Sequence, residues 1–173
     1  LLGENAEVLC VKGSGWDMAT IEPAGMPAVR LNALRSLRAR DAMADDEMVR
    51  VQRASLLDPM APNPSVETLL HAFVPHKYVD HTHSSAVLGL IDQPNGPERA
   101  RDVYGERVGV VPYILPGFGL AKKSAEVFDA DPKVQGLILE KHGIFTFGAD
   151  AREAYERMIE MVTLAEQRLA QNR

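Results

Sequence analysis

The sequence has little of what a secreted, membrane-spanning or nucleic-acid-binding protein needs. Cys10 is its single cysteine, so no disulfide can form within the chain, and we expect a reducing, cytoplasmic location. Its clean apolar runs, such as residues 86–91, are far too short to span a bilayer, and no charged-then-apolar leader is visible. The excess of 24 acidic over 19 basic residues gives a net charge of −5, which disfavours non-specific binding to nucleic acid.

What is present is an ordinary globular composition. Apolar residues make up 46% and charged residues 25% of the 173 positions, which excludes wholesale disorder and fits one domain. The chain opens at Leu1 on a strand already under way, so we expect an excised fragment.

Short apolar segments alternate with amphipathic ones along the chain, which predicts an α/β fold with layers around a central sheet. Strands are expected at 7–12, 78–83, 107–114, 136–142 and 144–147. Helices are expected at 28–38, within 38–51, and at 64–74, 84–91, 120–128 and 151–169, with loops at 17–27 and 92–106. Asp150 and Glu153 are spaced as a capping box for the last helix.

His81 and His83 form the sharpest chemical motif. Residues two apart on a strand point to the same face, about 6.5 Å apart, so both imidazoles can reach one metal ion. The third candidate ligand is His142, which ends an apolar strand just before Gly143. The alternative is three separate histidines, each with its own structural role. Sulfur ligands are lacking, so zinc, iron or manganese on imidazole donors are the options.

Glu67 lies at the start of the helix that leads into the His-x-His strand. Its carboxylate either stabilises the helix dipole or acts as an acid/base group beside a metal. His71 lies one turn later on the same helix face and either orients Glu67 or lies at the surface. We expect no functional role for His76.

The segment Lys12-Gly-Ser-Gly15 follows a strand. Its glycines let backbone amides approach an anion, Ser14 can donate a hydrogen bond and Lys12 adds positive charge. The alternative is a plain turn, because the spacing matches no established phosphate-binding motif.

Taken in order, these segments resemble the class II aldolase/adducin family. The resemblance rests on Lys12-Gly-Ser-Gly15, Pro64-Ser-Val-Glu67, His81-Thr-His83 and Leu139-Glu-Lys-His-Gly143, and covers residues 8–169. The segments starting at Glu67, Val79 and Ala154 are similar to the aldolase part of bifunctional rhamnulose-1-phosphate aldolase/short-chain alcohol dehydrogenases.

The resemblance implies roles for particular residues. It implies a Zn²⁺ ion, or another divalent transition metal, bound by three histidines, with one carboxylate as the catalytic acid/base and three residues that bind the substrate phosphate. These are His81, His83 and His142 for the metal, Glu67 for catalysis, and Ser14, Gly15 and Ser65 for the phosphate.

The resemblance also implies a three-layer α/β/α sandwich with a central mixed, largely antiparallel sheet, and a homotetramer. Family members carry an upstream N-terminal helix and a Gly-Asn-x-Ser loop, which we expect to be missing from this domain of residues 1–173. Val66 stands where simpler members have a second serine, and Tyr113 does not match the context of the family's catalytic tyrosines.

The implied activity is metal-dependent, reversible retro-aldol cleavage of a phosphorylated ketose, such as rhamnulose 1-phosphate, to dihydroxyacetone phosphate and an aldehyde. Two alternatives keep the same metal site, a sugar-phosphate 4-epimerase and a dehydratase or decarboxylase. Two others are a non-enzymatic adducin-like binding domain and a folded but inactive fragment. The three histidines and Glu67 favour an enzyme.

Overall fold

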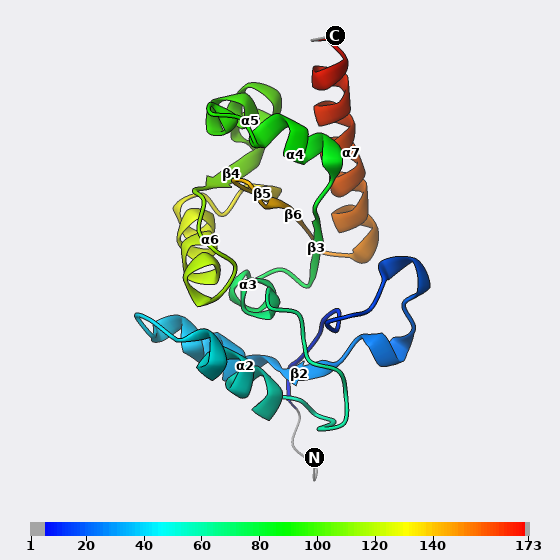
Figure 1. Cartoon of the computed structure of the whole chain (residues 1–173), viewed down its shortest axis with the longest axis vertical. Coiled ribbons are helices and arrows are strands. Elements are labelled where there is room, and N and C mark those ends of the chain that lie inside the picture. The colour runs from blue at the N-terminus through cyan, green and yellow to red at the C-terminus, as the bar shows by residue number, and fades with distance from the viewer. Residues whose placement is uncertain (1–5, 172–173) are drawn as a thin grey trace. The chain divides into compact units, whose positions relative to one another are not determined.

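The computed structural model describes residues 6–171, whose helices and strands are labelled in Figure 1. Within the chain, two compact units are distinguished. The first unit comprises Leu1–Val74 and Leu115–Lys122, and the second comprises Pro75–Ile114 and Lys123–Arg173.

The first unit is built on a small hairpin and short helices. Strand β1 (Val8–Cys10) pairs antiparallel with β2 (Ala28–Arg30). The helices are α1 (Leu31–Ser36), α2 (Asp45–Ala54) and α3 (Thr68–Phe73), with single 3-10 turns at Met18–Thr20, Pro23–Gly25 and Leu37–Ala39. The side chains of Leu34, Leu69 and Leu70 are fully buried, and Phe73 packs edge-on against Phe118.

Backbone hydrogen bonds in the first unit hold residues 12–14 beside residues 63–65, which precede α3, and this pair of segments is called the strap. Gly13 and Pro64 form an isolated antiparallel bridge. On either side of it, Ser14 N donates to Asn63 O at 2.7 Å and Ser65 N donates to Lys12 O at 3.0 Å. Two regions 50 residues apart in sequence therefore lie together.

The second unit contains a four-stranded sheet in the order β3-β6-β5-β4. Its strands are β3 (Tyr78–Thr82), β4 (Val108–Val111), β5 (Gly136–Leu139) and β6 (Gly143–Gly148). β3 and β5 each pair antiparallel with β6, whereas β4 pairs parallel with β5. The predicted mixed, largely antiparallel sheet is confirmed.

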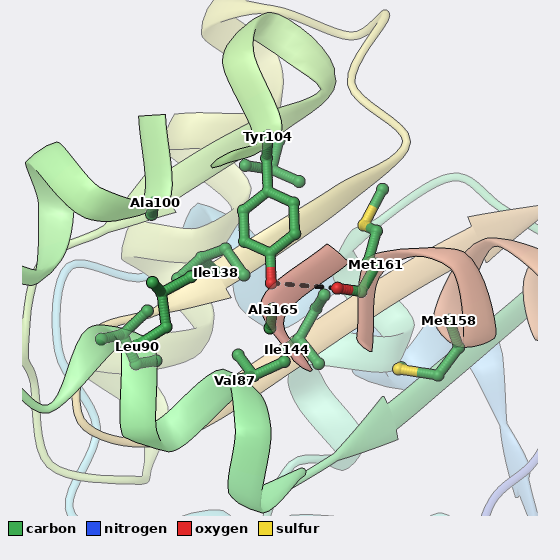
Figure 2. Packing of buried hydrophobic residues seen from close by; sticks show 11 residues of the cluster. Val87, Leu90, Ala100, Tyr104, Ile138, Ile144, Met158, Met161 and Ala165 are labelled. Carbon is green, nitrogen blue, oxygen red and sulfur yellow. Dashed lines mark hydrogen bonds between the residues drawn. The ribbon is translucent and has the colours of Figure 1, made fainter. Parts of the chain in front are cut away.

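Helices pack on both faces of this sheet. One face is covered by α4 (Ser85–Ile91), α5 (Gly96–Tyr104) and α7 (Ala151–Ala170), and a 3-10 turn at Gly105–Arg107 follows α5. The other helix is α6 (Phe118–Ala130), whose first residues belong to the first unit. Side chains of α4, α5 and α7 enclose Ile138 and Ile144 of the sheet (Figure 2). On the opposite face, Phe128 of α6 packs edge-on against Phe147. The predicted α/β class is therefore confirmed.

Several predicted elements differ from the structure. Residues 28–30 form strand β2 instead of the first turn of a helix, because they pair with β1. Residues 92–106 hold helix α5, not a loop. Pro97 lies in its first turn, where the missing amide hydrogen costs no intrahelical bond. Helix α3 begins at Thr68 and not near Pro64, because residues 63–65 are occupied by the strap, and α2 begins only at Asp45.

The last helix follows the prediction closely. Asp150 caps α7 by accepting from Glu153 N, and the Glu153 carboxylate accepts from Ala149 N at 2.6 Å. This reciprocal arrangement is close to the predicted capping box. Between residues 6 and 171, none of the helices combines the length and apolarity needed to cross a membrane.

Tyr104 makes a buried hydrogen bond in the core of the second unit, and its contribution to the free energy of unfolding can be measured. Its buried hydroxyl donates to the Met161 carbonyl at 3.2 Å (Figure 2), and burial raises its pKa to about 12, so it remains a neutral donor. We expect Tyr104→Phe to lower the free energy of unfolding by about 1 kcal/mol. Chemical denaturation should show this loss, while Tyr155→Phe on the exposed side of α7 should match the parent. Equal losses in both variants would contradict the assignment.

Candidate metal centre

Three histidines converge in the second unit. His81 lies on β3, His83 directly follows this strand, and His142 lies in the turn between β5 and β6. Their ring centroids are 4.8 Å apart for His81–His83, 5.2 Å for His81–His142 and 4.8 Å for His83–His142. Each ring offers one nitrogen, and these atoms lie within 4.8 Å of one another. The structure thus brings the three predicted ligands together.

The sheet orients the first of these imidazoles. Nδ1 of His81 lies 3.0 Å from the carbonyl oxygen of Ile144, and since a carbonyl can only accept, Nδ1 carries the hydrogen. Nε2 is then unprotonated and available as a donor to a cation. The ring also stacks on Phe145, its register partner on β6, with centroids 4.0 Å apart. A backbone carbonyl on the second ring nitrogen is the usual support of a metal-binding histidine.

The spacing of the donor atoms suits a small cation. Nε2 of His81 and Nε2 of His83 lie 3.0 Å apart. Two nitrogens bound tetrahedrally to one ion at 2.0–2.1 Å would stand about 3.3 Å apart. Three histidine donors would leave a fourth position on a tetrahedral ion open to a substrate oxygen, as in catalytic rather than structural zinc sites. The residues present therefore fit a divalent transition metal.

Gly143 makes room for two of these rings. A Cβ atom at this position would clash first with the backbone carbonyl oxygen of Thr82, and would also lie 3.0 Å from Cδ2 of His83 and 3.3 Å from Cε1 of His81. Any side chain here would therefore crowd both imidazoles. In the sequence Gly143 indicates only a turn, and its close approach to the histidine rings was not predicted.

The turn that carries His142 is held by its neighbours. His142 N donates to Leu139 O at 3.0 Å, and Lys141 between them has a φ of 56°, which is unusual for a residue other than glycine. The ammonium of Lys141 lies 5.6 Å from the ring centroid of Tyr113, and the carboxylate of Glu140 accepts from Tyr113 N at 3.2 Å. These contacts fix the turn and with it the backbone of His142.

Glu67 belongs to the first unit, where it is the N-cap residue of α3. Its backbone, at φ −79° and ψ 3°, lies in the sparsely populated bridge region that many active-site residues occupy. The hydroxyl of Ser65 donates to its carboxylate. This contact was not predicted, because the sequence alone does not show that residues 65–67 form a tight turn.

His71 follows Glu67 by one helical turn in the same unit, and its backbone N donates to Glu67 O at 3.2 Å. Burial lowers the pKa of His71 to about 4, and the negative charge of Glu67 opposes this shift only in part. The imidazole is therefore neutral near pH 7. The side chain is half-buried, and the negative charge of Glu67 acts on it.

The predicted phosphate-binding residues differ in what they contact. Gly15 is exposed with a φ of 85°, and no atom lies within 4 Å of the place where a Cβ would stand. Ser14 is exposed, and its hydroxyl makes only a long contact of 3.4 Å with Pro64 O. Ser65 is half-buried and engaged with Glu67.

His76 packs against two aromatic rings of the second unit. Its ring stacks on Phe147 with centroids 4.9 Å apart and meets Phe128 edge-on. Burial and the nearby Arg157 guanidinium lower its pKa.

Comparison with known proteins identifies the fold family. Residues 3–169 match the family model "Class II Aldolase and Adducin N-terminal domain". The chain belongs to this family. The N-terminal class II aldolase domain of a conserved protein from Thermoplasma acidophilum is similar in structure, with 39% identity, a TM-score of 0.88, and coverage of 94% of this chain and 75% of that one. Class II aldolases use a divalent metal, for which the three histidines provide donors.

The names of other relatives describe three different activities, an oxidoreductase, a dehydratase and an aldolase. "Uncharacterized oxidoreductase YuxG" from Bacillus subtilis (strain 168) is 42% identical over 165 residues, which are 95% of this chain and 24% of that protein. The chain thus spans about a quarter of the length of this relative. Methylthioribulose-1-phosphate dehydratase from Yersinia enterocolitica is 26% identical, over 81% of this chain and 77% of that protein. An L-fuculose 1-phosphate aldolase shares the fold, with a TM-score of 0.65 at 16% identity, covering 95% and 71% of the two chains.

The depressed pKa of His71 predicts a pH-dependent stability. The ordinary pKa of 6.5 applies to the unfolded chain and about 4 to the folded one, so the unfolded state takes up the proton first as the pH falls. The contribution of neutral His71 to the free energy of unfolding is therefore present above pH 6.5. It is lost as the pH falls from 6.5 to 4, which lowers the free energy of unfolding by up to about 3 kcal/mol.

The measurement is the free energy of unfolding of the metal-free protein against pH, for the parent and for His71→Gln. We expect a shallower decline below pH 6.5 in the variant, because the remaining titrating groups are common to both proteins. Parallel curves would show that His71 does not titrate as described.

Proposed function

We propose that this protein is a metal-dependent aldehyde-lyase that cleaves a phosphorylated ketose, such as rhamnulose 1-phosphate, to dihydroxyacetone phosphate and an aldehyde. The observation that carries the proposal is the convergence of three imidazole nitrogens in a chain of the class II aldolase family. Their donor chemistry favours Zn²⁺ among the divalent transition metals. When bound, the cation would supply Lewis-acid stabilisation of the negative charge that develops on the substrate oxygen.

The chain's own residues have separate roles in this proposal. His81, His83 and His142 hold the cation, and the Ile144 carbonyl keeps His81 in the ligating tautomer. Glu67 exchanges the proton at the hydroxyl-bearing carbon of dihydroxyacetone phosphate. The exposed Ser14 hydroxyl and the open backbone at Gly15 are suited to the phosphate group, with Ser65 adjoining them on the strap.

A dehydratase is the second candidate, because a methylthioribulose-1-phosphate dehydratase is among the relatives. Removal of water begins with abstraction of a proton from the carbon beside a carbonyl, and the carboxylate that exchanges such a proton in dihydroxyacetone phosphate would serve for this step too. Release of a free aldehyde distinguishes the two reactions, because only bond cleavage produces it. A 4-epimerase would re-form the bond and release neither water nor aldehyde. An adducin-like binding role would not require the three ligands.

The proposal extends to the assembly and the location of the protein. Family resemblance supports a homotetramer, and the single cysteine supports a cytoplasmic location. The substrate partner is a phosphorylated sugar, and we assign no nucleic-acid or membrane partner.

Glu67→Gln tests the assigned acid/base group. The variant keeps the shape of the side chain but cannot accept the substrate proton, so we expect hydrogen–deuterium exchange at dihydroxyacetone phosphate to fall by at least about 100-fold. Exchange is followed by proton NMR in D₂O on metal-loaded protein. Elemental analysis should show the same metal content in parent and variant, since the three histidines remain.

Equal exchange in the two proteins would remove Glu67 from the reaction. Product analysis with a ketose 1-phosphate decides the reaction class. Release of an aldehyde supports the lyase, and loss of water without aldehyde would replace it by the dehydratase.

A further inference from the structure

The turn between β5 and β6 contains a residue in an unfavourable backbone conformation. Lys141 has a φ of 56°, and between residues 6 and 171 it is the only residue other than glycine with a positive φ. Because His142 N donates to Leu139 O at 3.0 Å, Lys141 takes the third position of a type II-like turn, where glycine is the common choice. A side chain there is unfavourable, since its Cβ approaches a carbonyl oxygen. Lysine therefore destabilises this turn relative to glycine.

The side chain of Lys141 is seated on the neighbouring segment. Its ammonium lies 5.6 Å from the centroid of the Tyr113 ring, within the range of a cation–π contact. Tyr113 N donates to the Glu140 carboxylate at 3.2 Å, and Glu140 N donates to Val111 O at 3.0 Å. The turn and the end of β4 are therefore joined at three points, two through Glu140 and one through the Lys141 side chain.

This turn places His142. Leu139 pairs with Gly143 at the end of the hairpin, and residues 140–142 lie between these partners. Lys141 directly precedes His142, so its backbone conformation determines where the third imidazole stands relative to the other two. Ligands of a metal site have to be held to within about 0.5 Å of their working positions. A small change in this turn would therefore disturb the convergence of the three rings.

The charge of Lys141 acts against a cation site. An ammonium group near a bound cation repels it, so on charge alone a lysine beside His142 weakens the binding of a divalent ion. Lysine is thus unfavourable at this position for the backbone and for the charge. The contact with Tyr113 is the favourable interaction of the side chain that the structure shows, and it acts on the conformation of the turn.

We propose that Lys141 is a positioning residue for His142. Its ammonium, seated on the Tyr113 ring, holds the left-handed turn in the conformation that brings the His142 imidazole to the other two histidines, although the same residue lowers the stability of the metal-free fold. This inference rests on the proposed metal-dependent function. It concerns the binding of the cation and not the reaction, so it applies equally to an aldolase and to a dehydratase.

The test compares Lys141→Ala, Lys141→Gly and Lys141→Arg with Lys77→Ala in the full chain. Lys77 is the matched control, because its ammonium also lies over a ring, 5.5 Å from the centroid of Tyr78, at the end of β3 away from His81. Calorimetry gives the dissociation constant of Zn²⁺, and the visible absorption of bound Co²⁺ reports the coordination geometry. Thermal denaturation of the metal-free proteins gives Tm.

The variants have different expected results. Lys141→Ala should bind Zn²⁺ about 10-fold more weakly and change the Co²⁺ spectrum, whereas Lys141→Arg, which can stack on the same ring, should bind like the parent. Lys141→Gly should raise Tm by about 2–4 °C, because glycine relieves the left-handed backbone, and should still weaken Zn²⁺ binding by about 10-fold. Lys77→Ala should match the parent in affinity and spectrum.

Three results would overturn the proposal. The first is equal or tighter Zn²⁺ binding in Lys141→Ala, because that is the effect of removing a positive charge alone. The second is parent-like affinity in Lys141→Gly, which decides the question if Lys141→Ala does not fold. The third is a Tm of metal-free Lys141→Gly no higher than that of the parent, because the backbone would then carry no strain.

Failure of this inference differs from failure of the proposed function. If the parent binds no Zn²⁺, both are overturned. If Zn²⁺ binding depends on Lys141 as described but the loaded protein releases neither aldehyde nor water from a ketose 1-phosphate, the proposed function alone is overturned.

Discussion

The register between β6 and its two neighbours is the constraint on which the candidate site depends. β3 pairs with β6 so that His81 stands opposite Phe145, and β5 pairs with β6 so that Leu139 stands opposite Gly143. These pairings bring the end of β3 and the turn after β5 to the same end of the sheet. A shift by one residue would turn His81 and His83 to the opposite face, where Thr82 now contacts Met158 of α7.

The packing of the second unit fixes this register from both faces. Ile144 is buried among α4, α5 and α7, while Phe145 and Phe147 stack with His81 and His76 on the other face. Exchanging the two faces would place these aromatic rings among α4, α5 and α7 and would remove Ile144 from the core that these helices form. The histidines of the candidate site are therefore oriented by the same alternation of side chains that builds the core.

The sequence predicted those parts of the site that depend on local periodicity. His81 and His83 share a face because a strand has a period of two, and α7 was recognised from its apolar spacing and its Asp150 cap. The helix at Gly96–Tyr104 was missed because Pro94, Gly96 and Pro97 are typical of loops, although a proline in a first turn is compatible with a helix. Strand β2 was missed because its three residues depend on a partner strand. The contact between Ser65 and Glu67 depends on a bridge-region backbone that residue types do not reveal.

The measurement that tests the account most directly is anomalous diffraction at the zinc edge from crystals of the protein grown with equimolar Zn²⁺. The account predicts one strong peak per chain, about 2.0–2.1 Å from Nε2 of His81, Nε2 of His83 and a ring nitrogen of His142. A map without a peak among these imidazoles, or with zinc bound by only one of them, would contradict the metal centre and with it the proposed reaction.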